Sequence, residues 1–482
     1  MTILSRYSTR YPRALVYMLQ ASEYKIDDYL KWYYRTTDFR RVEYRKHLDK
    51  TAKAKLLLAV AWLESFAIAL LVAALLWFGL GPTASPVWLM VAVLVLALAP
   101  TVVAYGLLLP LVVGRVVIQR PKELKIIAEA HAVIMRHEAT KIAVAGSYGK
   151  TTFKDTLATV LAAGFAENEV RATPGNLNTP IGISRFVGKL TGQEKVLIFE
   201  LGEYYPGDVQ GLAEFVEPSM GIIAGINEAH LSKFKTLDAT VGTIFELADF
   251  LGDRPCYKNG ESALTANRAG PDPLLYTRKG MGDWVVEAPI SGLDGLAFTA
   301  HRGKVKVHVK SGLLGLHQIG PLVAMIDIAF SLGLSPTEIE IGLAATGPFE
   351  HRLQPRIDQG GVVTIDDSYN GNPDGARVAI EVLAGLSGHR RFYVTPGLVE
   401  MGDRTPEVHR EIGRQLAKAK IEVVVLIRNS ASIYIAEGLV AAKYAGRLIW
   451  YDDALVGLAA LPSLTAAGDV VLLQNDWPDA YA

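Results

Sequence analysis

Two long apolar runs near the amino terminus form the strongest hydrophobic pattern in the chain. They cover Leu56–Leu80 and Val87–Val117, and a short turn-forming stretch that begins at Gly81 separates them. Each run is long enough to cross a bilayer as a helix, whereas core helices of soluble proteins rarely stay uncharged over such a length. We therefore expect a two-helix transmembrane hairpin over residues 56–118. The alternative is a buried helical hairpin in a soluble domain.

Basic residues flank this pair of runs and are absent from the loop between them. They cluster at positions 40–55 before the first run and at positions 115–125 after the second. Because the cytoplasmic flanks of membrane spans carry an excess of Lys and Arg, both ends are expected to be cytoplasmic. The pattern predicts a multi-pass protein of the cell membrane, in contact with the lipid bilayer, with its other domains on the cytoplasmic side.

The segment before the first run, residues 1–55, mixes aromatic and basic residues. Such a mixture suits an amphipathic helix that lies on an anionic membrane surface or binds a lipid headgroup. An ordinary amphipathic helix packed on the soluble part explains the same pattern. Within the runs, Glu64 is the one ionisable residue of the first, and Pro100 and Pro110 predict kinks or an early end in the second.

The pattern changes near Thr140, where short β-rich runs begin to alternate with helical periodicity. The runs read KIAVAG, KVLIFELG, MGIIAGI, VVTIDD, RRFYVTPG, EVVVLI and DVVLLQ. Such alternation is typical of parallel sheets covered by helices, so the predicted fold class is α/β. Gly347 and Pro348 follow a helical stretch and predict a change of domain. We expect a central domain at 119–347 and a C-terminal domain at 348–482.

Composition narrows the class of protein. Lys and Arg together number 49, as do Asp and Glu, so the overall charge gives no electrostatic case for a nucleic-acid partner. Cys256 is the only cysteine, which excludes an internal disulfide framework and a multi-cysteine zinc site. The single cysteine fits a reducing compartment.

The first β-rich run continues into a glycine-containing turn that opens a helix. The turn consists of Gly146, Ser147, Tyr148, Gly149, Lys150, Thr151 and Thr152. Backbone N–H groups of such a turn face an anion, the Lys150 amine reaches the β- and γ-phosphates, and the Thr151 hydroxyl can hold Mg²⁺. The turn predicts an ATP site with Mg²⁺.

Five further segments resemble those of the Mur ligase family, whose phosphate loop has the same short glycine spacing. They are GNLNTPIGI (175–183), ELGEYYPGDVQGL (200–212), INEAHLSKF (226–234), LLGLHQIGPLVAMIDIA (313–329) and IDDSYNGNPDGA (365–376). The last is similar to the signature of the MurF branch. The resemblance implies a central P-loop-type ATPase domain followed by a Rossmann-like α/β domain.

The resemblance also implies roles for residues that match the family's motifs. The implied catalytic set is Lys150, Glu200 and His230. The implied Mg²⁺ ligands are Thr151, Glu200 and His230. Beyond the turn, the implied ATP contacts are His317, Gln318, Arg352 and Asp367. The implied substrate contacts are Asn176, Asn178, Thr179, Ser368, Tyr369, Asn370 and Asn372.

The reaction implied by the resemblance is carboxylate activation. ATP phosphorylates a carboxylate, and an amine then displaces phosphate from the acyl phosphate to give an amide. The expected partners are a cell-wall peptide precursor, lipid-linked or delivered at the membrane, and an amino acid or dipeptide. Two alternatives stay open: a membrane ligase of the poly-γ-glutamate type, and a non-catalytic nucleotide-binding scaffold for wall synthesis.

Three positions depart from the family's pattern. Ile244 stands where many members carry a carbamylated lysine, which puts a second Mg²⁺ site in question. Gln318 and Pro321 replace the asparagines of the family's His-Asn-x-x-Asn motif. The C-terminal sequence QNDWPDAYA replaces a Lys-Gly-Ser-Arg sequence, which leaves room for an amine other than D-alanyl-D-alanine.

Overall fold

The computed structural model describes residues 3–22, 24–40, 48–81, 85–227, 234, 236–369, 371–399 and 401–474. The chain divides into two compact units, residues 1–126 and residues 127–482. In the described residues the first unit is helical, and every strand belongs to the second.

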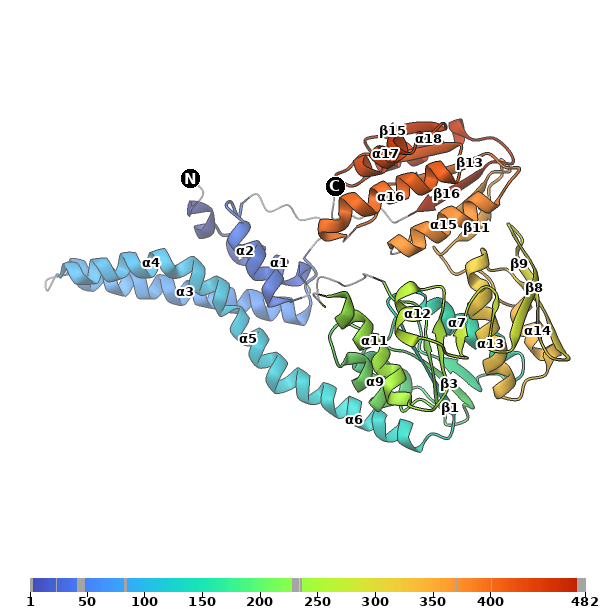
Figure 1. Ribbon diagram of the computed structural model, residues 1–482. Helices are drawn as coiled ribbons and strands as arrows, with labels where there is room; N and C mark the ends of the chain where they lie inside the picture. The colour runs from blue at the N-terminus through green and yellow to red at the C-terminus, as the bar shows by residue number, and fades with distance from the viewer. Residues whose placement is uncertain are drawn as a thin grey trace. The chain divides into compact units, whose positions relative to one another are not determined.

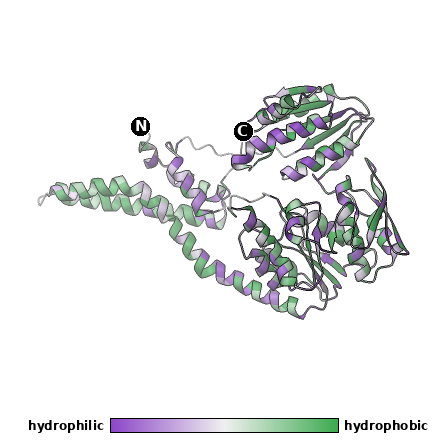
Figure 2. Ribbon diagram, viewed as in Figure 1, coloured by the Kyte–Doolittle hydropathy of each residue, from purple (hydrophilic) through white to green (hydrophobic). Residues whose placement is uncertain are grey.

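The first unit consists of two long helices with shorter helices beside them. Its elements are η1 (Ile3–Tyr7), α1 (Tyr11–Ala21), α2 (Ile26–Arg35), α3 (Ala52–Leu80), α4 (Pro86–Gly106), α5 (Leu108–Val113) and the π-helix η2 (Gly114–Gln119). Helices α3 and α4 lie side by side (Figure 1). They are apolar around most of their surface, which is largely exposed (Figure 2). By length and composition alone, α3 and the run Pro86–Arg136 are each sufficient for a membrane span.

Tyrosines of the first segment bond to the backbone of α4 at its internal proline. Pro100 has no N–H to give to the Leu96 carbonyl, and the Tyr7 hydroxyl donates to that carbonyl at 2.7 Å. The Tyr11 hydroxyl donates to the Pro100 carbonyl at 2.8 Å. The helix therefore continues through Pro100 and ends at Gly106. The aromatic residues of α1 and α2 pack against α3 and α4 in one apolar cluster.

The second unit begins with a six-stranded parallel sheet, entered from α6 (Arg120–Arg136). Its strand order is β2-β3-β1-β4-β5-β6. The strands are β1 (Thr140–Ala145), β2 (Val170–Ala172), β3 (Val196–Glu200), β4 (Met220–Ile223), β5 (Cys256–Asn259) and β6 (Leu275–Tyr276). The helices are α7 (Lys150–Ala162), α8 (Pro180–Val187), α9 (Asp208–Val216), α11 (Leu237–Leu251), α12 (Ala263–Ala269), α13 (Ile319–Ser331) and α14 (Pro336–Ala344). Because the strands are parallel, the carboxyl ends of β1, β3 and β4 meet at one edge.

A small antiparallel sheet lies between α12 and α13 in the chain, and the sequence pattern did not predict it. Its strands are β7 (Gly280–Met281), β8 (Trp284–Gly292), β9 (Gly295–Arg302) and β10 (Val305–Ser311). Trp284, Phe298 and Val307 from this sheet join the apolar core that covers one face of the parallel sheet. The short helix η3 (Leu316–Gln318) then leads into α13.

A second six-stranded sheet ends the chain, in the order β11-β12-β16-β13-β14-β15. Its strands are β11 (Gln354–Ile357), β12 (Val363–Asp367), β13 (Arg391–Thr395), β14 (Val423–Ile427), β15 (Arg447–Tyr451) and β16 (Val470–Gln474). Its helices are α15 (Pro373–Gly385), η4 (Gly402–Arg404), α16 (Thr405–Lys418), α17 (Ser432–Ala441) and α18 (Ala454–Leu464). All strand pairs are parallel except β11 with β12.

The predicted α/β class is confirmed, since all seven β-rich runs form strands. These strands are β1, β3, β4, β12, β13, β14 and β16. The predicted change of domain at Gly347 and Pro348 falls between α14 and β11, in the connection between the two large sheets. The domain limits themselves stay predictions.

Candidate functional site

The turn between β1 and α7 requires glycine at two positions. Gly149 immediately precedes α7 with φ of 78°, a conformation that costs glycine little and other residues much. At Gly146, with φ of 146°, a Cβ atom would lie 2.9 Å from the Gly225 carbonyl oxygen. The Ser147 N–H donates to that same carbonyl at 2.7 Å. The turn is thus fixed against the end of β4, and it leaves the first N–H groups of α7 free to bind an anion.

The Lys150 ammonium group, at the start of α7, lies between a carboxylate and a carbonyl. Its Nζ is 2.7 Å from Oε1 of Glu203 and also donates to the Gly146 carbonyl. Burial raises the pKa of Glu203, and the nearby Lys150 charge opposes that rise without cancelling it. Sequence analysis missed Glu203, although a second acid three residues after Glu200 was visible in the same motif.

Glu200 ends β3 and is 2% exposed. Its Oε2 accepts hydrogen bonds from the Thr151 hydroxyl at 2.9 Å and from Lys154 Nζ at 3.2 Å. Its Oε1 accepts from Asn178 Nδ2 at 3.2 Å. A hydroxyl beside a carboxylate is a pair of oxygen donors that fits Mg²⁺. His230, the other implied ligand, lies outside the described residues.

Lys154 is fully buried and was not predicted. Besides Glu200, its Nζ donates to the Gly175 carbonyl at 2.6 Å and lies 3.4 Å from Asp155. It stands one helical turn after Lys150, so both ammonium groups belong to the same end of α7. The available signal was a second lysine four residues after Lys150, in the helix that follows the phosphate-type turn.

His317 and Gln318 form another wall of the site. Burial lowers the pKa of His317 to about 4, so its ring is neutral at physiological pH. The Gln318 Nε2 lies 3.0 Å from Nε2 of His317, and the amide donates to this unprotonated ring nitrogen. The pair presents neutral polar groups, which suit an uncharged ligand such as a nucleobase better than a phosphate.

The C-terminal part of the unit contributes two predicted ATP contacts. Arg352 Nη1 donates to the Thr152 hydroxyl at 3.3 Å, and its guanidinium lies 4.9 Å from the Tyr369 ring centroid. Asp367, at the end of β12, accepts a hydrogen bond from Gln474 Nε2 at 3.0 Å. Burial raises the pKa of Asp367 to about 6. The carboxylate is therefore mostly ionised at neutral pH.

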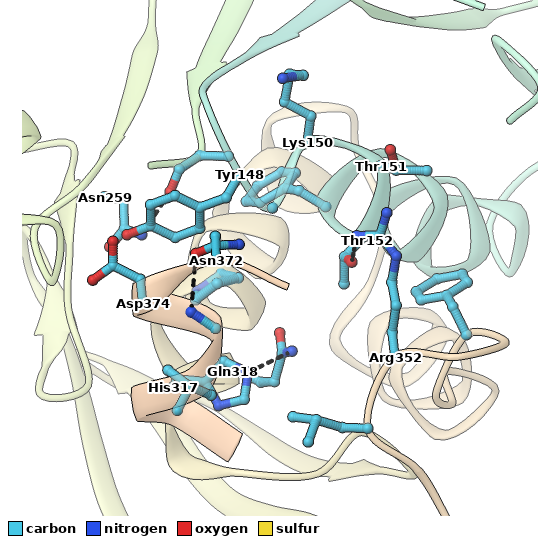
Figure 3. Close-up of a pocket in the computed structure, with 18 of the residues that line it drawn as sticks. Tyr148, Lys150, Thr151, Thr152, Asn259, His317, Gln318, Arg352, Asn372 and Asp374 are labelled. Atoms are coloured by element: carbon cyan, nitrogen blue, oxygen red, sulfur yellow. Dashed lines mark hydrogen bonds between the residues drawn. The ribbon is translucent and has the colours of Figure 1, made fainter. Parts of the chain in front are cut away.

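These groups line one cavity of about 420 Å³ (Figure 3). The predicted residues that the structure brings together there are Ser147, Tyr148, Gly149, Lys150, Thr151, Thr152, Asn176, Asn178, Glu200, His317, Gln318, Arg352, Asp367, Tyr369 and Asn372. Lining residues that sequence analysis missed include Glu203, Tyr204, Asn259, Glu261, Arg278 and Arg377. Their signal is weak in a single sequence because polar residues of these types are common on any protein surface.

Five other predicted residues lie elsewhere or are not described. Thr179 begins α8, where its hydroxyl accepts from the Gly182 N–H at 3.2 Å. The Ser368 hydroxyl donates to Oδ1 of Asp366 at 2.6 Å. Gly146 supports the turn from behind and does not line the cavity. Asn370, like His230, falls outside the described residues.

The first strand of the parallel sheet opens into a phosphate-type turn, opposite a carboxylate at the end of a strand. Joined to a second α/β sheet, this arrangement defines a class of nucleotide-dependent ligase folds. Comparison with known proteins places the chain within that class. The Mur ligase middle domain matches residues 144–326, and the Mur ligase, glutamate ligase domain matches residues 351–474. The chain belongs to the Mur ligase family.

Relatives similar to this chain include MurF proteins. The UDP-N-acetylmuramoyl-tripeptide--D-alanyl-D-alanine ligase of Mycobacterium tuberculosis is 31% identical over 312 residues, which are 61% of this chain and 59% of that protein. The chain thus spans about three fifths of that relative. Crystal structures of MurF from Acinetobacter baumannii and of MurF from Thermotoga maritima with ADP each align with a TM-score of 0.63. They are 23% and 22% identical, cover 73% of this chain, and are covered over 77% and 80% of their own length. The likeness shows a MurF-like fold.

The predicted multi-pass membrane location was wrong. The likeness to MurF proteins contradicts that location. Two apolar helices are weak support for a span, because buried core helices and signal sequences pass the same test of length and composition. The comparisons likewise give no support to the lipid bilayer as a partner.

Proposed function

We propose that this chain is an ATP-dependent ligase that joins a carboxylate to an amine through an acyl phosphate. The observation that carries the proposal is the convergence of Lys150, Glu200 and Arg352 on one cavity. The lysine stands at a helix N-terminus, the glutamate ends the neighbouring strand, and the arginine comes from the C-terminal part of the unit. Phosphoryl transfer requires a phosphate-binding turn, a carboxylate that binds a hard cation, and an arginine, all around one space.

ATP is proposed to bind with its triphosphate on the turn and its base toward His317 and Gln318. Backbone N–H groups at the start of α7 and the Lys150 ammonium group would hold the phosphates. Arg352, whose contact to Thr152 already puts its guanidinium beside the turn, would reach the terminal phosphate. Asp367 would accept a ribose hydroxyl. An arginine that approaches from a separate part of the unit can sense whether the phosphate is present.

Mg²⁺ is proposed to bind at Thr151 and Glu200, with His230 as a further ligand. The first two already lie within hydrogen-bond distance, and Lys154 and Asn178 fix the carboxylate in place. When bound, the cation neutralises charge on the phosphate oxygens.

In the proposed reaction, an oxygen of the acceptor carboxylate attacks the γ-phosphorus, and the bond to the β-phosphate bridging oxygen breaks to release ADP. Lys150 stabilises the charge on the transferred group. The amine nitrogen then attacks the acyl carbon, and phosphate leaves with one oxygen of the original carboxylate. The proton lost by the amine balances the step.

The acceptor is proposed to be a cell-wall peptide precursor, and the amine an amino acid or dipeptide. The support is the name shared by the relatives, which describes a UDP-N-acetylmuramoyl-tripeptide and D-alanyl-D-alanine. Asn176, Asn178, Tyr369 and Asn372 line the cavity and offer polar groups for a peptide. Both a UDP-linked and a lipid-linked peptide belong in the test, because the family domains match residues only from 144 onward.

The proposal is tested by incubating the full chain with ATP, Mg²⁺, a peptide acceptor and an amine, and by weighing the products by mass spectrometry. We expect ADP release that requires both acceptor and amine, together with a new amide of the combined mass less one water. ATP binding without turnover on any acceptor would favour the alternative of a non-catalytic scaffold.

A further inference from the structure

The Lys150 ammonium group, which is proposed to bind the nucleotide's phosphates, already has a buried acidic partner. Glu203 is 3% exposed, and its Oε1 lies 2.7 Å from Lys150 Nζ. The lysine side chain is itself only 11% exposed. A lysine ammonium group has three N–H donors, and here two are given to the Gly146 carbonyl and the Glu203 carboxylate.

The backbone holds Glu203 in this position. The Gly202 N–H donates to the Asn178 carbonyl at 2.9 Å, and a Cβ on Gly202 would lie 2.7 Å from that oxygen. This close approach brings the residue after Gly202 next to the turn. Glu200 and Glu203 therefore both line the cavity from the end of β3, and each has a lysine of α7 as its partner.

A polyphosphate and Glu203 would bind the same ammonium group of Lys150. Both are anions that bind an ammonium group through oxygen, and both are strengthened by the low exposure of this corner. Glu203 and a polyphosphate beside the same lysine repel each other, so they compete for the Lys150 ammonium group.

We propose that Glu203 occupies on Lys150 the place of a nucleotide's terminal phosphates and is displaced when they bind. This inference rests on the proposed nucleotide site and adds a specificity-determining residue to it. Glu203 weakens the binding of every ligand that contacts Lys150, and it leaves the binding of ligands without β- and γ-phosphates unaffected. The residue thereby sets how strongly the site prefers a triphosphate to a monophosphate.

A second lysine–carboxylate pair supplies the matched control. Lys258 Nζ lies 2.7 Å from Oδ2 of Asp272 and also donates to the Cys256 carbonyl, so its bonding copies that of Lys150. Neither Lys258 nor Asp272 lines the cavity. Asp272→Asn removes the same charge from an equally short pair of the same unit.

The test measures dissociation constants for ATP and for AMP by calorimetry, in EDTA so that no divalent cation takes part. The proteins are the full chain, Glu203→Gln and Asp272→Asn. We expect Glu203→Gln to bind ATP on the order of tenfold more tightly, the effect of removing one competing hydrogen bond to a charged group, and AMP within about twofold of the unmodified chain. Asp272→Asn should leave both constants unchanged. Glu203→Ala should shift ATP binding in the same direction, and thermal melts report whether each variant is folded.

An unchanged or weaker ATP affinity in folded Glu203→Gln would overturn the inference, as would an equal gain for AMP. Both results leave the proposed function standing, because the unmodified chain still binds ATP. No binding of either nucleotide by any of the proteins would instead remove the proposed function, and this inference with it.

Discussion

Two groups of paired charges, one in each six-stranded sheet of residues 127–482, lie at opposite ends of their strands. In the C-terminal sheet, Arg391 starts β13 and bonds Glu422 just before β14, at 2.8 Å. In the central sheet, Glu200 ends β3 and Lys150 follows β1, so the charges stand at the carboxyl ends. Amino-end charges of the C-terminal sheet tie strands to one another, whereas carboxyl-end charges of the central sheet line a cavity.

The difference teaches how to tell a structural ion pair from a functional one. Arg391 also donates to the Ala384 and Lys420 carbonyls, so its donors are used by the protein itself. The Lys150 and Glu200 groups face a space large enough for a ligand. In parallel α/β sheets ligands bind outside the carboxyl ends of strands, which agrees with this division.

The largest effect is expected at the turn. Lys150→Ala should lower amine-dependent ATP turnover by about three orders of magnitude, because it removes the cation that stabilises the transferred phosphoryl group. Steady-state release of ADP measures the change, with circular dichroism as the check on folding. Full turnover by the variant would put the lysine outside the chemistry.

The next effect concerns the stability of the carboxyl-end cluster. Lys154→Met keeps the side chain's length and removes its charge, which leaves Glu200 buried with one partner fewer. We expect the free energy of unfolding to fall by about 3 kcal/mol. Thermal melts measure it, and the double variant Lys154→Met with Glu200→Gln should recover part of the loss. No recovery would mean that Lys154 stabilises the fold through packing alone.

The amino-end pair of the C-terminal sheet should respond differently. Arg391→Leu is expected to cost about 1–2 kcal/mol of stability, reduced because Glu422 is 39% exposed and solvent screens the pair. ATP affinity should stay within about twofold of the unmodified chain. A tenfold loss of affinity in a folded protein would break the distinction between the two ends.

The smallest effect is a pH dependence at Asp367. Its pKa of about 6 in the folded protein lies above the ordinary value of 3.8, so the carboxyl is protonated below that pH and ionised above it. Nucleotide affinity should therefore rise by about threefold from about pH 5 to about pH 7, because a carboxylate accepts a ribose hydrogen bond more strongly. The same shift makes the folded state lose stability as pH rises between the two pKa values.

Calorimetry with ADP checks this pH dependence against Asp367→Asn. The nucleotide's own titration is common to both proteins and cancels in the comparison. Equal slopes for the two proteins would show that Asp367 does not contact the ligand.

The central turn could be predicted because its signals are local. The glycines, Lys150 and the preceding β-rich run are adjacent in the chain. The antiparallel strands β8, β9 and β10 escaped prediction because their pairing depends on partners and on a bulge near Glu287. Their apolar periodicity alone did not separate them from loops.

The site residues that local patterns did not reach have partners far away in the sequence or roles set by burial. Arg352 meets Thr152 across 200 positions, and Lys154 meets Glu200 across 46. A lone sequence shows neither distance, so Arg352 was reached through family resemblance and Lys154 was not reached at all. Thr179 was placed with the substrate, whereas its hydroxyl caps α8.

The most direct measurement follows oxygen through the reaction. A peptide acceptor carrying oxygen-18 in its reacting carboxylate is turned over with ATP and an amine, and the released phosphate is weighed. Transfer through an acyl phosphate predicts one labelled oxygen in every phosphate formed with the amide, and ADP as the other product. Unlabelled phosphate in step with amide formation, or AMP with pyrophosphate in place of ADP, would contradict the account.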